Sequence, residues 1–138
     1  MAYWLLKTEP SAYSFSDLQR DGETVWDGVR NAQALINIRA MYAGDHALIY
    51  HSGDERAVVG TAQIASDPYP DPQAGDPKLV VVDVRAGQPA TEPVPLAAIK
   101  ADPAIATMVL IRQPRLSVLP VTDEQWHRLL ELAGIRED

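Results

Sequence analysis

The sequence predicts a small α+β domain, a partly open β-barrel of about five to six strands with short helices packed around it. Short apolar segments with strand spacing alternate with short helical segments along all 138 residues. Hydrophobic residues make up 46% of the chain and charged residues 22%, which is typical of a globular protein. No internal repeat, low-complexity segment or interdomain linker is present, so we expect one domain over residues 1–138.

The chain begins with a strand and a short helix. Residues 3–8 carry apolar side chains at the start of both faces, which predicts a strand that is covered on both sides. A capping box that begins at Ser14 is typical of a helix start and Gly22 of a helix end, so a helix is expected over 15–20. Residues 23–29 are expected to form a connection.

The middle of the chain predicts a longer helix and a β-hairpin. Apolar residues at three- and four-residue spacing indicate a helix over 30–42. The segments 47–51 and 57–64 have the composition of strands and flank the turn sequence SGDER. We therefore expect them to pair as an antiparallel hairpin.

The second half predicts one more central strand, and a helix at the end. Residues 67–78 contain four prolines, which is typical of a loop, whereas 79–85 form a continuous apolar run expected of a central strand. Two short helices and a final strand are expected over 95–100, 103–108 and 115–119. A capping box at Thr122 and the apolar stripe that follows it predict a C-terminal helix.

Composition and charge narrow the function classes. No stretch approaches the ~20 apolar residues of a membrane span, and no basic segment followed by an apolar run suggests a signal peptide. The chain has no Cys, which fits a reducing compartment, and we expect a cytoplasmic location. The formal net charge of −7 repels a phosphate backbone. A nucleic-acid ligand would therefore have to be bound by a few basic groups around a selective pocket.

Catalytic signatures are missing from the sequence. No G-x-S-x-G nucleophile elbow and no phosphate-binding glycine loop occurs. The three histidines, His46, His51 and His127, have none of the spacings of a zinc site. We therefore expect no catalytic residue, metal or cofactor.

Three clusters combine aromatic or basic residues with polar ones. They are Trp26–Asn31 (WDGVRN), Tyr50–Gly53 (YHSG) and Arg112–Val118 (RQPRLSV). An indole next to a glycine leaves room for a flat ligand on the ring face, and base stacking contributes roughly 1–3 kcal/mol. Arginines suit phosphate or base-edge contacts. The alternative for each cluster is structural: a core tryptophan with a helix cap, a hairpin turn, and a surface turn that pairs with acidic side chains.

Five stretches in this order resemble the EVE domain family of the PUA-like superfamily: YWLLKTEP, WDGVRN, GDHALIYHSG, YPDP and LIRQPRLSVLPVTDEQW. The resemblance runs from residue 3 to about residue 130. It implies a PUA-like fold and a non-catalytic module that binds DNA or RNA. It also implies that the module recognises a modified base, with modified cytosine as the leading candidate.

The resemblance also implies a set of ligand-binding residues, each in a matching motif. They are Trp4, Lys7, Glu9, Trp26, Arg30, Asn31, Tyr50, His51, Ser52, Arg115 and Ser117. Trp26 or Trp4 would offer a ring face, and Lys7, Asn31 and Ser117 would address the polar edge of the base. The two arginines, Arg30 and Arg115, would hold a phosphate or shape the pocket.

This chain departs from the usual family pattern at four positions. The residues Ala32, Leu35, Ile36 and Leu79 stand where the family has an aromatic residue, an Arg, an Asn and a Trp. The departures imply a smaller wall that would admit a bulkier base, or weaker binding.

Two alternative functions stay open at this point, and so does the oligomeric state. One is an interaction protein that covers a partner with Leu35, Ile36 and Met41. The other is a nucleotide-processing enzyme that uses Lys7, Glu9, Asp27 and His51 as acid–base groups in the same cleft.

Overall fold

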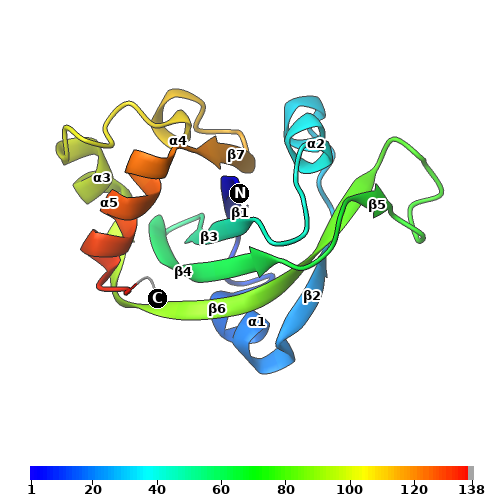
Figure 1. Cartoon of the computed structure of the whole chain (residues 1–138), viewed down its shortest axis with the longest axis horizontal. Helices are drawn as coiled ribbons and strands as arrows, with labels where there is room; N and C mark the ends of the chain where they lie inside the picture. The colour runs from blue at the N-terminus through cyan, green and yellow to red at the C-terminus, as the bar shows by residue number, and fades with distance from the viewer. Residues whose placement is uncertain (137–138) are drawn as a thin grey trace.

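The computed structural model describes residues 1–136 and forms one mixed sheet of seven strands with short helices around it (Figure 1). The strands are β1 (Tyr3–Thr8), β2 (Glu23–Trp26), β3 (His46–His51), β4 (Ala57–Ile64), β5 (Tyr69–Pro70), β6 (Val80–Pro95) and β7 (Val118–Val121). The helices are α1 (Phe15–Asp21), α2 (Ala32–Arg39), α3 (Leu96–Ala101), α4 (Val109–Arg112) and α5 (Asp123–Ala133). The α+β class predicted from the sequence is confirmed.

The strand order is β2-β6-β4-β3-β1-β7, with β5 paired to β6. Only β1 and β3 run parallel among the pairs in the described part of the chain. The end strands β2 and β7 do not pair within residues 1–136, so the sheet curves but stays open. The predicted hairpin is the β3–β4 pair, with a register shift between Ile49 and Tyr50.

Four expectations about the strands and loops need correction. Residues 23–26 were expected in a connection but form β2, because they find an antiparallel partner in β6. The loop expected over 67–78 contains the short β5, and β6 continues past residue 85 to Pro95 along β4. The last strand starts at Val118 rather than at 115, since a turn in which the Leu116 N–H donates to the Gln113 carbonyl precedes it.

The capping signals in the sequence predicted the starts of α1 and α5 correctly. Both predicted capping boxes are present, at Ser14 before α1 and at Thr122 before α5. The helix α2 is shorter than the predicted 30–42. The helix predicted over 103–108 is wrong, because that segment consists of successive turns, and α4 begins only at Val109.

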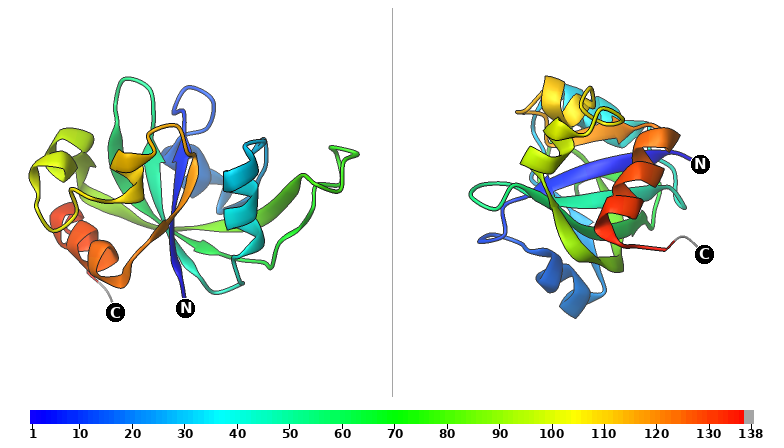
Figure 2. Two further views of the ribbon diagram at one scale, coloured as in Figure 1. Left: turned by 90° about the horizontal axis from the view of Figure 1, so that it is seen from above. Right: turned by 90° about the vertical axis from the view of Figure 1, so that its left-hand side faces the viewer.

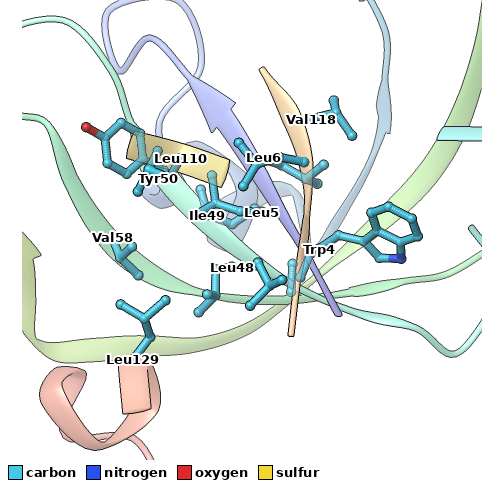
Figure 3. Packing of buried hydrophobic residues seen from close by; sticks show 14 of the residues in the cluster. Trp4, Leu5, Leu6, Leu48, Ile49, Tyr50, Val58, Leu110, Val118 and Leu129 are labelled. Carbon is cyan, nitrogen blue, oxygen red and sulfur yellow. The ribbon is translucent and has the colours of Figure 1, made fainter. Parts of the chain in front are cut away.

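Strand β1 passes through the core, and its last two residues, Lys7 and Thr8, are polar. It lies between β3 and β7 (Figure 2), and its Leu5 and Leu6 are completely buried. Figure 3 shows the side chains of Leu5, Leu48 and Ile49 packed together, with Leu129 of α5 close by. Because both sides of β1 are covered, as predicted, the positions of Lys7 and Thr8 at its end are fixed. Among the described helices, none is long and apolar enough to cross a membrane.

Tyr69 anchors the small strand β5 to β6. Its hydroxyl donates a 2.6 Å hydrogen bond to Asp83 Oδ1. This hydrogen bond, together with partial burial and nearby carboxylates, raises the pKa of Tyr69 to about 12.

Candidate functional site

A hollow of about 370 Å³ lies between the start of α2 and the segment that leads into β7. It is lined by Asn31, Gln33, Gln113, Pro114, Arg115 and Leu116. The Asn31 side chain caps α2, and its Oδ1 accepts a 3.0 Å hydrogen bond from the Ala34 N–H. The cap therefore uses the oxygen of the amide and leaves its NH₂ group as a donor.

Lys7 lies next to this hollow and is bonded to Pro114, one of its lining residues. Its Nζ donates to the Pro114 carbonyl at 2.8 Å and lies 5.7 Å from the centroid of the Tyr50 ring. The backbone N–H of Lys7 donates to the Ser117 carbonyl at 2.9 Å, which holds this end of β1 against the segment before β7. Burial lowers the pKa of Lys7 and raises the pKa of Tyr50.

Arg115 and Arg30 add positive charge near the same place. Both are exposed, and within residues 1–136 neither forms an ion pair with a carboxylate. Arg115 lines the hollow, and Arg30 directly precedes the capping Asn31. An unpaired guanidinium on an acidic protein is suited to an external anion.

A second hollow of about 500 Å³ lies around Trp26, at the end of β2. It is lined by Thr8, Ala12, Tyr13, Thr24, Val25, Trp26 and Asp27. The indole of Trp26 is only 8% exposed, and its ring meets the Tyr13 ring edge-on, with centroids 6.4 Å apart. The segment 26–31 therefore borders both hollows, with Trp26 and Asp27 at one and Asn31 at the other.

His51 links the start of α1 to the β3–β4 turn and faces neither hollow. Its ring is buried, with Nε2 accepting from the Phe15 N–H at 3.0 Å and Nδ1 lying 3.0 Å from Glu55 Oε1. Since Nε2 accepts, Nδ1 carries the proton and donates to the carboxylate. Both ring nitrogens are therefore engaged within the protein.

Glu9 lies in the connection between β1 and α1, and Ser52 lies in the turn between β3 and β4. The Glu9 carboxylate packs against Gly53, whose φ of +78° favours glycine. The Ser52 N–H donates to the Thr8 carbonyl at 2.9 Å. Neither residue lines the two hollows described above.

Trp4 lies near the opposite end of β1 from Lys7. Its indole is 6% exposed, and in Figure 3 it points away from Val58 and Leu129. Its Nε1 donates to Asp45 Oδ2 at 3.0 Å. The buried indole lines neither of the hollows.

Asp45 is the buried acceptor that holds Trp4. It also accepts from the backbone N–H groups of Tyr42, at 3.0 Å, and Ala2, at 3.1 Å. Burial alone would raise the pKa of Asp45, but these three hydrogen bonds outweigh it and keep that pKa below its ordinary value.

The structure thus brings Asn31 and Arg115 to one hollow, with Lys7 bonded to its lining residue Pro114, and leaves several predicted residues elsewhere. Sequence reasoning missed Gln33, Gln113, Pro114 and Leu116 as lining residues. Gln33 had a signal, because it lies two residues after the matching stretch WDGVRN, at the start of the predicted helix. The Pro114 contact is a backbone carbonyl, which no side-chain pattern reveals.

The apolar partner surface expected at α2 also changes. Leu35 and Met41 are 6% and 1% exposed, so they belong to the core. Ile36 is 54% exposed, and among those three residues it is the one that faces solvent. Tyr42, the last residue of the helix predicted over 30–42, lies beyond the end of α2 and is 70% exposed.

Known proteins resemble this chain over nearly its full length. The model of the EVE domain family matches residues 2–132. Human thymocyte nuclear protein 1 is 31% identical over 165 residues, which cover 95% of this chain and 73% of the human protein. A solved structure of a Rhodopseudomonas palustris protein is 43% identical with a TM-score of 0.94, covering 100% of this chain and 97% of that one. The human THYN1 protein in complex with DNA containing 5-methylcytosine is 30% identical with a TM-score of 0.89, covering 99% of this chain and 100% of that one.

Proposed function

Because this chain belongs to the EVE domain family, we propose that it binds DNA carrying a modified base, with modified cytosine as the preferred ligand. The observation that carries this proposal is the similarity to the human THYN1 protein, whose structure contains 5-methylcytosine DNA. The proposed place of binding is the hollow between the start of α2 and the segment before β7. We also propose, as the sequence predicts, that residues 1–138 form one domain and that the protein is located in the cytoplasm.

The size and chemistry of this hollow suit a base that has left its stack. Its volume of about 370 Å³ falls within the range of roughly 300–1,000 Å³ that is usual for small-ligand sites. A base inserted there can accept from the Asn31 NH₂ group, which remains after capping. Lys7, half-buried and bonded to the lining residue Pro114, adds positive charge beside the hollow.

The proposed phosphate contacts are few. Arg115 at the hollow and Arg30 beside it are free of ion pairs among the described residues and can each neutralise one phosphate. A chain of net charge −7 gains little from non-specific attraction to nucleic acid. Most of the selectivity in this proposal therefore comes from the base in its hollow.

We assign Trp26 a supporting role. Its ring is largely buried and packed edge-on against Tyr13, so it forms the wall of the neighbouring hollow instead of an open stacking platform. A nucleotide next to the recognised base is the ligand we propose for that hollow.

Binding without catalysis fits the state of the acid–base groups. His51, the strongest candidate for proton transfer, has both ring nitrogens engaged by Phe15 and Glu55. Glu9 packs against Gly53 in the same loops and lines neither hollow. A general acid or base must reach the reacting atom, and neither side chain is placed to do so.

Fluorescence anisotropy with labelled oligonucleotides tests the proposal. The set comprises DNA and RNA strands that are identical except for one cytosine, 5-methylcytosine or 5-hydroxymethylcytosine, measured at low and moderate salt. We expect saturable binding that is strongest for a modified cytosine in DNA. A preference for RNA would mean that the ligand is RNA rather than DNA. Absence of saturation with every strand would refute the proposal.

Two variants connect the binding to the hollow. Arg115→Ala should weaken binding to all strands and reduce its salt dependence by about one counterion. Arg20→Ala is the matched control, because Arg20 is an exposed arginine of α1, which lies across the sheet from α2 in Figure 1. Equal losses in the two variants would place the nucleic acid elsewhere.

A further inference from the structure

Two amide side chains of α2 form a chain of hydrogen bonds that ends at β7. Gln33 Nε2 donates to Asn37 Oδ1 at 3.2 Å, one helical turn later. Asn37 Nδ2 in turn donates to the Val118 carbonyl at 2.7 Å. Asn37 is one of the few buried polar residues of the described chain, with 9% exposure.

This chain of bonds sets the orientation of both amides. A carbonyl can only accept, so Asn37 must turn its NH₂ group toward Val118 and its oxygen toward Gln33. Gln33 must then use its NH₂ group to reach that oxygen. Pairs of this kind, four residues apart on a helix, also stabilise each other.

The consequence lies in the hollow. Gln33 is one of its lining residues, and with the NH₂ group turned toward Asn37 its Oε1 is the atom left for a ligand. Within residues 1–136 no donor engages that oxygen. The first turn of α2 therefore offers two different groups to the hollow: an amide NH₂ on Asn31 and an amide oxygen on Gln33.

We propose that Gln33 is a specificity-determining residue that accepts a hydrogen bond from the exocyclic amino group of the bound cytosine, and that Asn37 is its positioning residue. This inference rests on the proposed function. The ring nitrogen and carbonyl oxygen of the same base are acceptors, which complement the Asn31 NH₂ group.

The chemistry of the bases shows what such an acceptor distinguishes. The bases 5-methylcytosine and thymine carry the same methyl group, so an apolar wall does not separate them. They differ at the amino group, which thymine replaces with a carbonyl oxygen, and at the adjacent ring nitrogen, which accepts in 5-methylcytosine and donates in thymine. A carbonyl facing Gln33 Oε1 would leave two acceptors opposed, and a site built around a hydrogen bond rejects a ligand that lacks it.

The test measures the ratio of the affinities for 5-methylcytosine and thymine. Single-stranded DNA strands that differ only at this base remove the cost of breaking a base pair. For the natural chain we expect a clear preference for 5-methylcytosine, and in Gln33→Met we expect the ratio to fall by about tenfold. Gln19→Met is the matched control, since Gln19 is an exposed residue of α1, and its ratio should not change.

The outcomes separate the two proposals. If the natural chain binds no strand, the proposed function fails. If it binds 5-methylcytosine and Gln33→Met keeps the full preference over thymine, the role of Gln33 is refuted while the proposed function stands.

Two substitutions of Asn37 test positioning against a purely structural role. Asn37→Asp keeps an oxygen for Gln33 Nε2, whereas Asn37→Leu removes it, and both lose the amide NH₂ group that donates to Val118. We expect Asn37→Asp to retain the ratio and Asn37→Leu to lower it as Gln33→Met does. Similar ratios in both Asn37 variants would overturn the positioning role. If Asn37→Leu does not fold, Asn37→Ala, which removes the same oxygen, takes its place, and a ratio equal to that of Asn37→Asp overturns the positioning role.

Discussion

Replacing Asp45 with Asn tests whether Trp4 is an anchor of the fold. The Asp45 carboxylate accepts from the Trp4 indole, the Tyr42 N–H and the Ala2 N–H. An Asn with its oxygen at the Oδ2 position keeps the first two bonds as neutral ones and turns its NH₂ group toward Ala2. Each retained bond then weakens by about 0.5–1 kcal/mol and the third bond, worth about 1 kcal/mol, is lost. We expect Asp45→Asn to lower the free energy of unfolding by about 2–3 kcal/mol at pH 7.

Urea unfolding monitored by tryptophan fluorescence measures this difference, with a drop in Tm of roughly 5–10 °C as a second readout. Asp54→Asn is the control, because Asp54 is exposed in the β3–β4 turn and makes no side-chain hydrogen bond within residues 1–136. A loss below about 0.5 kcal/mol in Asp45→Asn would refute the anchor role of this carboxylate.

The pH dependence of the same difference follows from the direction of the pKa shift. The folded-state pKa of Asp45 lies below its unfolded value of about 3.9. The stability gained from the charged carboxylate is therefore present above the unfolded pKa and lost as the pH falls through the folded pKa. The gap between the natural chain and Asp45→Asn should narrow in acid. A gap that is as large in strong acid as at pH 7 would show that the charge is not its source.

Three further predictions concern the site, the core and the small strand β5. Lys7→Met should keep the fold, because Met fills the same half-buried position without a charge, but weaken oligonucleotide binding about tenfold. Lys100→Met, on an exposed position of α3, should leave binding unchanged, and an unfolded Lys7→Met would contradict the expectation. Gly60→Ala should cost about 1–3 kcal/mol in urea unfolding, since its Cβ would lie 2.5–2.8 Å from Phe15 ring atoms, and equal stability would contradict this contact. Spectrophotometric titration should show one phenol ionising near pH 12, and this ionisation should disappear in Tyr69→Phe. Since the folded pKa of Tyr69 lies above the unfolded value of about 10, the stability that this phenol contributes should be lost as the pH rises from about 10 through the folded pKa.

Short-range signals explain why some elements were predicted accurately. The capping boxes at Ser14 and Thr122 connect residues three positions apart, and both helices begin where these boxes indicate. The β3–β4 hairpin needed only two apolar segments and a turn between them. In contrast, β2 looked like a connection because its pairing with Val82–Arg85 of β6 lies far along the chain.

The candidate site shows the same division. The family motifs directed attention to Asn31 and Arg115, which line one hollow, and to Lys7, which is bonded to the lining residue Pro114. The same motifs included Trp4 and His51, whose polar atoms are used by Asp45 and by Phe15 with Glu55. A motif marks a residue that the family needs, but it does not distinguish a ligand contact from a contact that holds the fold.

The sequence by itself determined the α+β class, the starts of α1 and α5, the central hairpin and the resemblance to the EVE family, because those depend on neighbouring residues and on the order of motifs. Only the tertiary structure decided which polar groups remain available to a ligand. The bonds from Lys7 to Pro114 and from Asn37 to Val118 join residues 107 and 81 positions apart. Whether a side chain is free depends on such distant partners. A polar group that is removed from water must find a partner within the fold. The buried polar groups are therefore used by the fold, and the remaining ones are available to a ligand.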